Sequence, residues 1–254
     1  FFVQNKTSTP QKDFQNSKEL KEFSTIINCC SIRKIAYLII RPFILKSNIV
    51  MFANNNNPIN LSQFIKESGN EYASVVDDGV AAGDVNSYID TGSFLFNALL
   101  SGSIHGGLPS NKITALAGES ATGKTYFALG MVKNFLDSNP DGYCLYFDTE
   151  AAVNKPLLQS RGIDLDRLVV INVVTIEEFR TKALKAIDIY LKTNTEDRKP
   201  CMFVLDSLGM LSTEKEIKDA LDDKQVRDMT KSQLVKGAFR MLTLKLGQAN
   251  IPLI

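Results

Sequence analysis

The sequence predicts an α/β fold in which a mainly parallel sheet is flanked by helices. Short apolar segments with the character of buried strands alternate with segments whose apolar residues recur at helical spacing. This alternation is typical of parallel sheets, because each parallel connection needs a crossover that is usually a helix. The chain has 254 residues, of which 44% are hydrophobic, so it is long enough for one large domain with a real core and an extension.

The first fifty residues differ from the rest. The chain does not begin with methionine, and its apolar run at residues 35–45 is interrupted by Arg41 and Pro42. A run that short and broken does not span a bilayer, and it lies too far from the start for an ordinary signal peptide. We therefore expect residues 1–50 to be a non-native or disordered extension, read in frame upstream of a natural start at Met51. The alternative is an N-terminal helix that touches a membrane.

Residues 51–87 are expected to hold an oligomerisation helix and a linker. Asn60 is a candidate N-cap for a short helix whose apolar face contains Leu61 and Phe64. Such a helix cannot bury that face alone, so it packs either on its own core or on a neighbouring subunit. Residues 70–86 are acidic and rich in small residues, as in a linker.

Beyond the linker, the chain approaches its most informative motif. A strand near Tyr88 precedes a helix that Thr91 is expected to cap. A glycine-rich turn at residues 101–110 then leads to a buried strand at residues 113–117. The single histidine, His105, lies in this turn and is expected to be a surface residue rather than a metal ligand.

The segment at residues 118–125 has the form of a phosphate-binding P-loop, G-x-x-x-x-G-K-[ST]. Its positions are Gly118, Glu119, Ser120, Ala121, Thr122, Gly123, Lys124 and Thr125. A strand before it and a helix after it aim backbone N–H groups and a helix N-terminus at a phosphate chain. We predict that these eight residues bind the phosphate chain of a nucleotide, with Lys124 at the β and γ phosphates and Thr125 as a ligand of Mg²⁺. The alternative is a glycine-containing turn with no ligand.

The rest of the chain continues the alternation. We expect strands at residues 143–147, 168–173, 201–205 and 251–254. Helices are expected to follow Asn154, to begin with a capping box at residues 175–178, and to bury one face between Val235 and Leu246. Because the chain ends on a newly begun strand, we expect the sheet to be truncated at the C-terminus.

Acidic residues follow two of these strands. Parallel α/β sheets bind ligands at the carboxyl ends of their strands, which selects Asp148, Glu150 and Asp206. Asp206 has the Walker B form and should hold Mg²⁺ directly or through water. Glu150 is placed to orient the attacking water and accept its proton, whereas Asp148 is expected to be a structural acceptor. The alternatives are that Asp206 caps the next turn and that Glu150 faces the N-terminus of the following helix.

Two segments at these strand ends resemble RecA-family recombinases. They are Phe147-Asp148-Thr149-Glu150 and the run Asp206-Ser207-Leu208-Gly209-Met210-Leu211-Ser212-Thr213. The second is similar to the recombinases of T-even-type bacteriophages. The resemblance covers about residues 58–254, and it implies that residues 88–254 are a partial RecA-like ATPase core.

The resemblance also implies an activity. It is that of a DNA-dependent ATPase that uses ATP and Mg²⁺, forms homo-oligomeric helical filaments on single-stranded DNA, and catalyses homologous pairing and strand exchange in recombination and repair. Glu150 and Lys124 would be the catalytic residues, and Thr125 and Asp206 the metal ligands. Single-strand-binding and mediator proteins are the implied partners, no membrane is involved, and the location is the cytoplasm, that of a bacterial host if a phage encodes the protein.

The resemblance assigns two further regions. The family places an aromatic residue seven positions after the glutamate to stack on adenine, and the corresponding residue here is Leu157. Its DNA-binding loop maps near residues 215–231, with Lys224, Arg227 and Lys231 as candidate contacts. Acidic residues outnumber basic ones there, and the net charge of the chain is only +1, so the alternative is a solvated helical surface.

Two other functions stay open at this point. One is a hexameric DNA helicase built on the same core, and the other is a non-catalytic recombinase paralogue that binds ATP as a structural ligand. The presence of Lys124, Glu150 and Asp206 argues against the paralogue.

The cysteines indicate a reducing compartment. Cys144 and Cys201 each lie in an apolar strand-like run, and Cys29 and Cys30 are adjacent without zinc-type spacing. We expect buried free thiols rather than disulfides or a zinc site.

Overall fold

The structure, a computed structural model, describes residues 61–70, 72–80, 82–222 and 229–254. The chain divides into two units, residues 1–56 and 57–254, and every described residue lies in the second. The expected extension at residues 1–50 therefore lies outside the described residues. The same holds for Lys224 and Arg227, two of the three candidate DNA contacts.

A three-stranded parallel sheet forms the centre of the second unit. Its strands are β3 (Tyr143–Asp148), β4 (Leu168–Asn172) and β5 (Cys201–Asp206), in the order β4-β3-β5. Two single bridges continue it beyond β5, because Leu253 pairs in parallel with Phe203 on one side and with Ile113 on the other. The segment before the P-loop thus lies at the edge of the sheet, and the predicted parallel α/β arrangement is confirmed.

The predicted strand at residues 113–117 is wrong beyond Ile113, the one residue of this segment that pairs in the sheet. The backbone groups of Leu253 bind Lys112 and Thr114, but both the N–H and the C=O of Ile254 bind β5. The backbone N–H and C=O groups of neighbouring strand residues point to opposite sides, so those of Ile254 point away from the segment before the P-loop. In the described part of the chain, no backbone hydrogen bond therefore pairs residues 115–117 with the sheet. The predicted strand at residues 251–254 is likewise reduced to its bridges.

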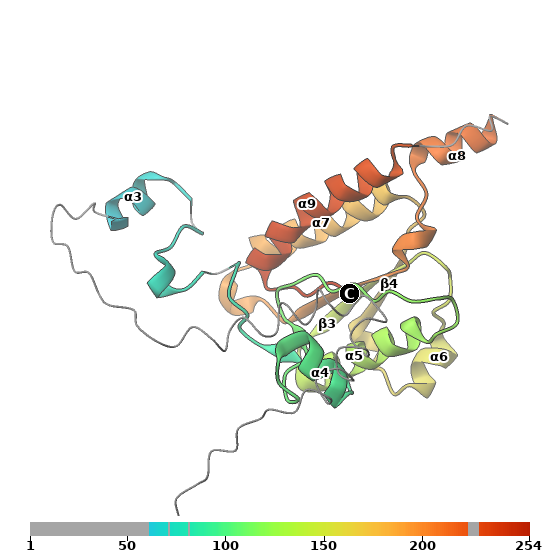
Figure 1. Ribbon diagram of the computed structural model, residues 1–254, viewed down its shortest axis with the longest axis horizontal. Coiled ribbons are helices and arrows are strands. Elements are labelled where there is room, and N and C mark those ends of the chain that lie inside the picture. The colour runs from blue at the N-terminus through green and yellow to red at the C-terminus, as the bar shows by residue number, and fades with distance from the viewer. Residues whose placement is uncertain (1–60, 71, 81, 223–228) are drawn as a thin grey trace, which may run out of the picture. The chain divides into compact units, whose positions relative to one another are not determined.

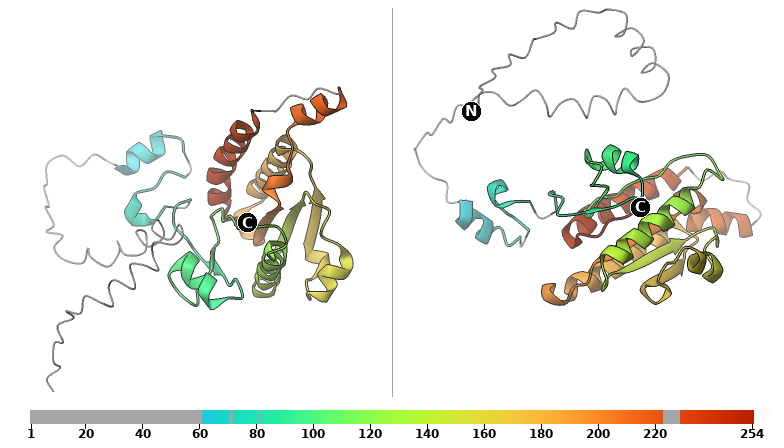
Figure 2. Two further views of the ribbon diagram at one scale, coloured as in Figure 1. Left: turned by 45° about the vertical axis from the view of Figure 1, so that its right-hand side comes forward. Right: turned by 90° about the horizontal axis from the view of Figure 1, so that it is seen from below.

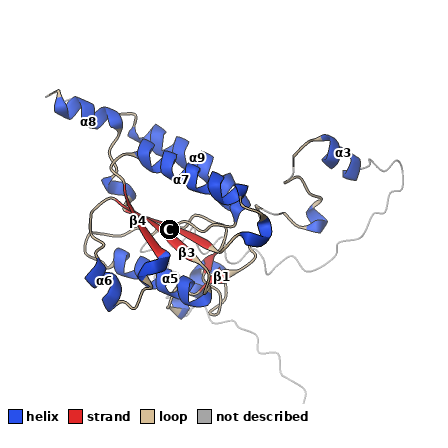
Figure 3. Cartoon of the chain, turned by 180° about the vertical axis from the view of Figure 1, so that it is seen from behind, coloured by secondary structure: helices blue, strands red, loops and turns tan. Residues whose placement is uncertain are grey.

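Helices cover both faces of the sheet. α5 (Lys124–Ser138) and α6 (Lys155–Ser160) lie on one face, whereas α7 (Ile176–Lys192) and α9 (Lys231–Ala249) lie side by side on the other (Figure 1, Figure 2 and Figure 3). Among the described residues, no helix combines the length and the apolar content that crossing a bilayer requires.

Successive side chains of each strand point to opposite faces of the sheet. Tyr146 and Val204 are buried on the α5 side, whereas Phe147 and Phe203 are buried on the side of α7 and α9. The ring of Phe147 meets that of Phe179 in α7 edge to face, at a centroid distance of 5.1 Å. The sheet therefore has an apolar core on each face, which holds the strands in one register.

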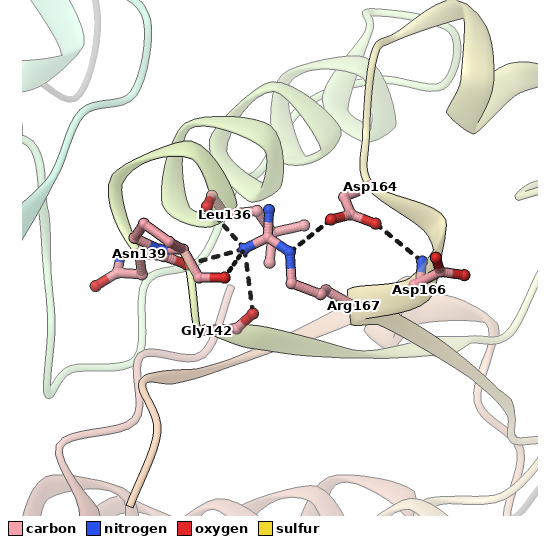
Figure 4. A network of polar contacts seen from close by, with 7 residues as sticks. Leu136, Asn139, Gly142, Asp164, Asp166 and Arg167 are labelled. Atoms are coloured by element: carbon pink, nitrogen blue, oxygen red, sulfur yellow. Dashed lines mark hydrogen bonds and ion pairs between the residues drawn. The ribbon is translucent and has the colours of Figure 1, made fainter.

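Arg167 anchors the carboxyl end of α5 (Figure 4). Its Nη1 lies 2.9 Å from the carbonyl oxygens of both Leu136 and Asn139, and its Nε lies 2.7 Å from Oδ2 of Asp164. The last carbonyls of a helix lack partners and carry partial negative charge, so a cation there is stabilising. The P-loop helix is thereby fixed at the end opposite to the P-loop.

The helix α4 (Phe94–Ser101) begins later than predicted. The predicted cap, Thr91, is wrong, because Ser93 occupies the N-cap and its side chain accepts from the N–H of Phe96. Thr91 is buried instead, and its hydroxyl donates to Oδ1 of Asn97 at 2.7 Å. Asn97 is the buried residue of α4, so this helix turns a polar side chain inward. Leu100 is partly buried against the core, whereas Phe94, Leu95, Phe96 and Leu99 stay exposed.

The segment before the P-loop contains more structure than predicted. α3 (Leu61–Glu67) forms as expected and has no buried residue, whereas its predicted N-cap, Asn60, lies outside the described residues. In the described part of the expected linker, residues 76–78 form a 3₁₀ turn, η2 (Val76–Asp78). The strand predicted near Tyr88 is confirmed as β1 (Tyr88–Ile89). It pairs antiparallel with β2 (Leu108–Pro109), which was not predicted because a strand of two residues shows no periodicity.

The capping box predicted at residues 175–178 is only half formed. Thr175 accepts from the N–H of Glu178, but the Glu178 carboxylate accepts from Val174 and not from the cap. A complete box, which was not predicted, opens α8 (Glu214–Leu221), where Thr213 and Glu216 each bind the other's backbone N–H.

Candidate nucleotide-binding site

The P-loop lies on the surface, at the N-terminus of α5. Residues 118–123 are all exposed. Gly123 occupies the N-cap with a φ of 89°, and a Cβ on Gly118 would lie 3.2 Å from the hydroxyl of Thr122. Gly123 is thus suited to a left-handed backbone conformation, and Gly118 allows the hydroxyl of Thr122 to approach the backbone closely. No side chain caps α5, so the N–H groups of its first turn remain open to an anion.

Lys124 folds back across the loop. Its Nζ donates to the carbonyl oxygens of Gly118 at 2.9 Å and Glu119 at 2.7 Å. The hydroxyl of Thr122 donates to the same Glu119 oxygen at 2.8 Å. These contacts hold the ammonium group over the loop, where phosphate oxygens can replace the carbonyls as its partners.

Thr125 and Asp206 meet although 81 positions separate them in the sequence. Oγ1 of Thr125 lies 2.6 Å from Oδ2 of Asp206, and the hydroxyl of Tyr146 donates to the same oxygen at 2.8 Å. Burial and the bond to Asp206 raise the pKa of Tyr146, so its phenol keeps the proton that it donates. The two residues predicted to hold a metal therefore form one contact.

These oxygens fit Mg²⁺. An alcohol and a carboxylate are the hard ligands that this ion prefers, and Mg²⁺ usually takes one or two protein groups together with waters and phosphate oxygens. The described residues contain no group of three or more His, Cys, Asp or Glu side chains that could hold a metal alone. The arrangement suits an ion that a nucleotide helps to bind.

Glu150 is tied to the end of the neighbouring strand. The hydroxyl of Ser207 donates to Oε1 of Glu150 at 2.6 Å. The hydroxyl of Thr149 accepts from the N–H of Ser207 at 2.7 Å. Because Asp148 and Asp206 are register partners, the chain leaves β3 and β5 side by side and these groups meet.

Asp148 has the structural role expected for it. It is buried, and its carboxylate accepts from the N–H of Glu150 at 3.0 Å and from that of Val153 at 3.4 Å. These bonds shape the turn after β3, and this turn presents the exposed Glu150 to solvent.

Two cavities border the P-loop and share Lys124. One, of about 290 Å³, reaches Asp206 and Ser207, whereas the other, of about 660 Å³, runs along Tyr126 and Phe127 at the start of α5. Leu157, predicted to contact adenine, lies in α6, where it is half-buried against the core below α5. It lines neither cavity.

Lys231 is the candidate DNA contact that the structure describes. It is the first residue of α9 and is partly exposed. Among the residues described, no hydrogen bond or ion pair joins it to the P-loop, and nothing brings it to the nucleotide-binding site.

Sequence reasoning missed Tyr146, Thr149 and Ser207. Tyr146 was expected to be only a core residue, and all three act through bonds that span 57 to 60 positions. The one available signal was that each lies close in sequence to an acid at the end of a strand.

Two of the four cysteines and the histidine are placed as expected, whereas Cys29 and Cys30 lie outside the described residues. Cys144 and Cys201 are free and buried, and burial raises the pKa of the Cys201 thiol to about 12. His105 is exposed in its turn.

A glycine loop at a helix N-terminus, with its threonine bound to a strand-end aspartate of a parallel sheet, defines the class of P-loop α/β proteins. Residues 59–254 match the RecA N-terminal domain family. The chain belongs to this family.

Individual relatives agree with this assignment. A recombination and repair protein of Enterobacteria phage T4 is 35% identical over 160 residues, which are 63% of this chain and 39% of that protein. The protein RecA of Cereibacter sphaeroides is 28% identical over 149 residues, or 59% of this chain and 40% of that one. The protein RecA of Malacoplasma penetrans is 28% identical over 163 residues, or 64% and 45%. The chain thus spans less than half the length of these relatives.

Proposed function

We propose that the protein is an ATP-dependent recombinase, which forms helical filaments on single-stranded DNA and catalyses homologous pairing and strand exchange. The observation that carries the proposal is the 2.6 Å contact between Thr125 and Asp206, because it joins the P-loop and the strand-end acid into one site. Membership of the RecA N-terminal domain family supports recombination as the use of that site. The likeness to the recombination and repair protein of phage T4 supports it further.

In this proposal, the site binds ATP and prepares a water for its hydrolysis. The N–H groups of residues 118–125 bind phosphate oxygens, and Lys124 exchanges its carbonyl partners for the β and γ phosphates. Thr125 and Asp206 would hold Mg²⁺, which would neutralise phosphate charge. Glu150 orients the attacking water and accepts its proton.

ATP and DNA act through the assembly state of the protein. We propose that ATP binds more tightly to the filament that holds DNA than to the free protein, so ATP binding favours the filament and hydrolysis weakens it. A ligand shifts such an equilibrium only by the difference in its affinity for the two states. Because the net charge of the chain is only +1, DNA is expected to contact local basic side chains and not an overall basic surface. Lys224, Arg227 and Lys231 are the proposed contacts. Single-strand-binding and mediator proteins are the proposed partners, and the cytoplasm is the proposed location.

The helix α3 is proposed to dock on a neighbouring subunit. Its Leu61 is 53% exposed and its Phe64 is 67% exposed, and the helix has no buried residue. An apolar face of this kind is stable only when another surface covers it.

Titration with ATP and Mg²⁺ tests the site. We expect calorimetry to show saturable binding by the unchanged protein, and the Lys124→Ala variant to bind at least about tenfold more weakly, because each hydrogen bond to a charged group contributes about 1.5–3 kcal/mol. An unchanged protein that does not bind ATP would sink the proposal.

Electron microscopy with ATP and single-stranded DNA tests the assembly. Open helical filaments are expected, whereas closed rings would indicate a hexameric helicase and an absence of assembly would indicate a non-catalytic paralogue. A variant with Leu61→Ser and Phe64→Ser should lose filaments and keep ATP binding. The matched control is Ile189→Ser, which changes an exposed apolar residue of α7 and should keep both.

A further inference from the structure

Tyr126 and Arg161 form a stacked pair beside the P-loop. The guanidinium carbon of Arg161 lies 3.8 Å from the centroid of the Tyr126 ring. Tyr126 is the third residue of α5, directly after Thr125, and Arg161 is the C-cap residue of α6. Since Tyr126 is 52% exposed, the pair is accessible from solvent instead of filling a core.

Tyr126 lies where the nucleoside end of a nucleotide would leave the P-loop, whereas Arg161 lines neither of the two cavities and is linked to this place through its stack on the Tyr126 ring. The smaller of the two cavities contains Asp206, so it takes the terminal phosphate and the metal. Tyr126 lines the larger cavity together with Gly123 and Lys124. A triphosphate held at Lys124 by its terminal phosphates therefore directs its nucleoside away from Asp206, toward Tyr126.

Arg161 also has unused hydrogen-bonding capacity. Its guanidinium makes no hydrogen bond or ion pair with any other residue that the structure describes. The other stacked arginine, Arg198, lies 5.9 Å from the ring of Tyr190 and donates to the carbonyls of Thr193 and Leu191. The guanidinium of Arg198 is thus bound to carbonyls at the end of α7, whereas that of Arg161 is a planar cation whose N–H donors have no partner among the described residues.

We propose that Tyr126 and Arg161 are the platform on which the purine base of the nucleotide stacks, an inference that rests on the proposed ATP site. Aromatic rings and arginine planes both attract the π-face of a base. Leu157 lies one helical turn before Arg161, whose N–H donates to the Leu157 carbonyl at 3.2 Å. A leucine offers only aliphatic contact, so the stacked pair supplies the flat surface that position 157 lacks.

Equilibrium titration with three ligands tests this role. The ligands are MgATP, MgCTP and magnesium tripolyphosphate, which has no base. We expect Arg161→Gln and Tyr126→Leu each to weaken ATP binding about tenfold, to narrow the preference for ATP over CTP, and to leave tripolyphosphate binding unchanged. Losses in the double variant should be less than additive, because the two residues act as one surface.

Two controls separate the platform from a contact that only joins α5 to α6. Tyr126→Phe retains the aromatic ring and should recover most of the ATP affinity that Tyr126→Leu loses. Arg198→Gln removes the other stacked arginine and should change thermal unfolding without changing affinity. If Arg161→Gln does not fold, Arg161→Lys replaces it, since lysine keeps the charge but not the planar stack, and the same loss of ATP affinity is expected.

The possible failures are distinguishable. Unchanged ATP affinity in the Tyr126 and Arg161 variants, or an equal loss of tripolyphosphate affinity, overturns the platform and leaves the ATP site in place. If the unchanged protein binds none of the three ligands, the ATP site and the platform fall together.

Discussion

The hydroxyl of Ser207 lies 2.6 Å from Oε1 of Glu150, across 57 positions of sequence. This bond restricts the carboxylate that is proposed to orient the attacking water. Ser207 is itself held by Thr149, whose hydroxyl accepts from its N–H. In the proposed mechanism Ser207 is therefore a positioning residue, and its contact with Glu150 depends on the register between β3 and β5.

The first prediction concerns hydrolysis. Glu150→Gln should keep ATP binding and slow hydrolysis by about 100-fold, because an amide does not accept the proton. Ser207→Ala should lower kcat by about tenfold with little change in KM, because it only releases the orientation of Glu150. Steady-state ATPase assays with single-stranded DNA measure both.

The matched control is Ser207→Thr, which retains a hydroxyl and should recover most of the lost rate. Normal turnover by Glu150→Gln would remove Glu150 from its role. A threonine variant as slow as the alanine variant would show that the hydroxyl of Ser207 does not matter.

The second prediction concerns the metal. Tyr146→Phe should raise the Mg²⁺ concentration for half-maximal ATP hydrolysis by about tenfold, because the phenol orients the Asp206 oxygen and groups that orient a ligand affect metal affinity by about that factor. Phenylalanine keeps the buried ring, so stability should fall by only about 1 kcal/mol. Magnesium titration of the ATPase measures the shift. Tyr190→Phe, on the opposite face, is the control, and equal midpoints for both variants would contradict the role of Tyr146.

The third prediction concerns stability. Arg167→Met should lower the free energy of unfolding by about 2–3 kcal/mol, because the carbonyls of Leu136, Asn139, Pro140 and Gly142 lose their contact with the guanidinium, although that of Asn139 keeps the N–H of Gly142. In urea unfolding, this loss appears as a lower midpoint concentration of urea, with an unchanged dependence of the free energy of unfolding on urea concentration. Asp164→Asn removes only the ion pair and should cost less. Equal losses in the two variants would mean that the carbonyl contacts contribute little.

The fourth prediction concerns acid pH. The side chain of Asn97 and the N–H of Gly92 donate to Asp90 and hold the pKa of its carboxyl below the ordinary value. A carboxyl whose pKa is lower in the folded state contributes stability that is present above its unfolded pKa and lost as the pH falls through its folded pKa. Asp90→Asn should therefore flatten the dependence of the free energy of unfolding on pH as the pH falls below the ordinary aspartate pKa of about 3.9. Equal slopes for the two proteins would exclude Asp90 as a cause.

Helix caps show where local sequence stops being sufficient. Asn154 caps α6 as predicted, since its side chain accepts from Leu157 without competition. The hydroxyls of Thr91 and Ser93 both precede α4 and could cap it. The Thr91 hydroxyl donates to the buried Asn97, so Ser93 is the residue that caps the helix. That choice depends on what the inner face of the helix meets.

The amino-acid order by itself determined the P-loop, the parallel α/β class and the acids at the strand ends, because glycines, apolar runs and helical spacing act within a few residues. Only the tertiary structure decided that Thr125 meets Asp206 and that Ser207 meets Glu150. The same holds for the stack of Arg161 on Tyr126. Distant segments come into contact only after the cores on both faces of the sheet fix the strand register, and the register is a property of the packed chain rather than of any single segment.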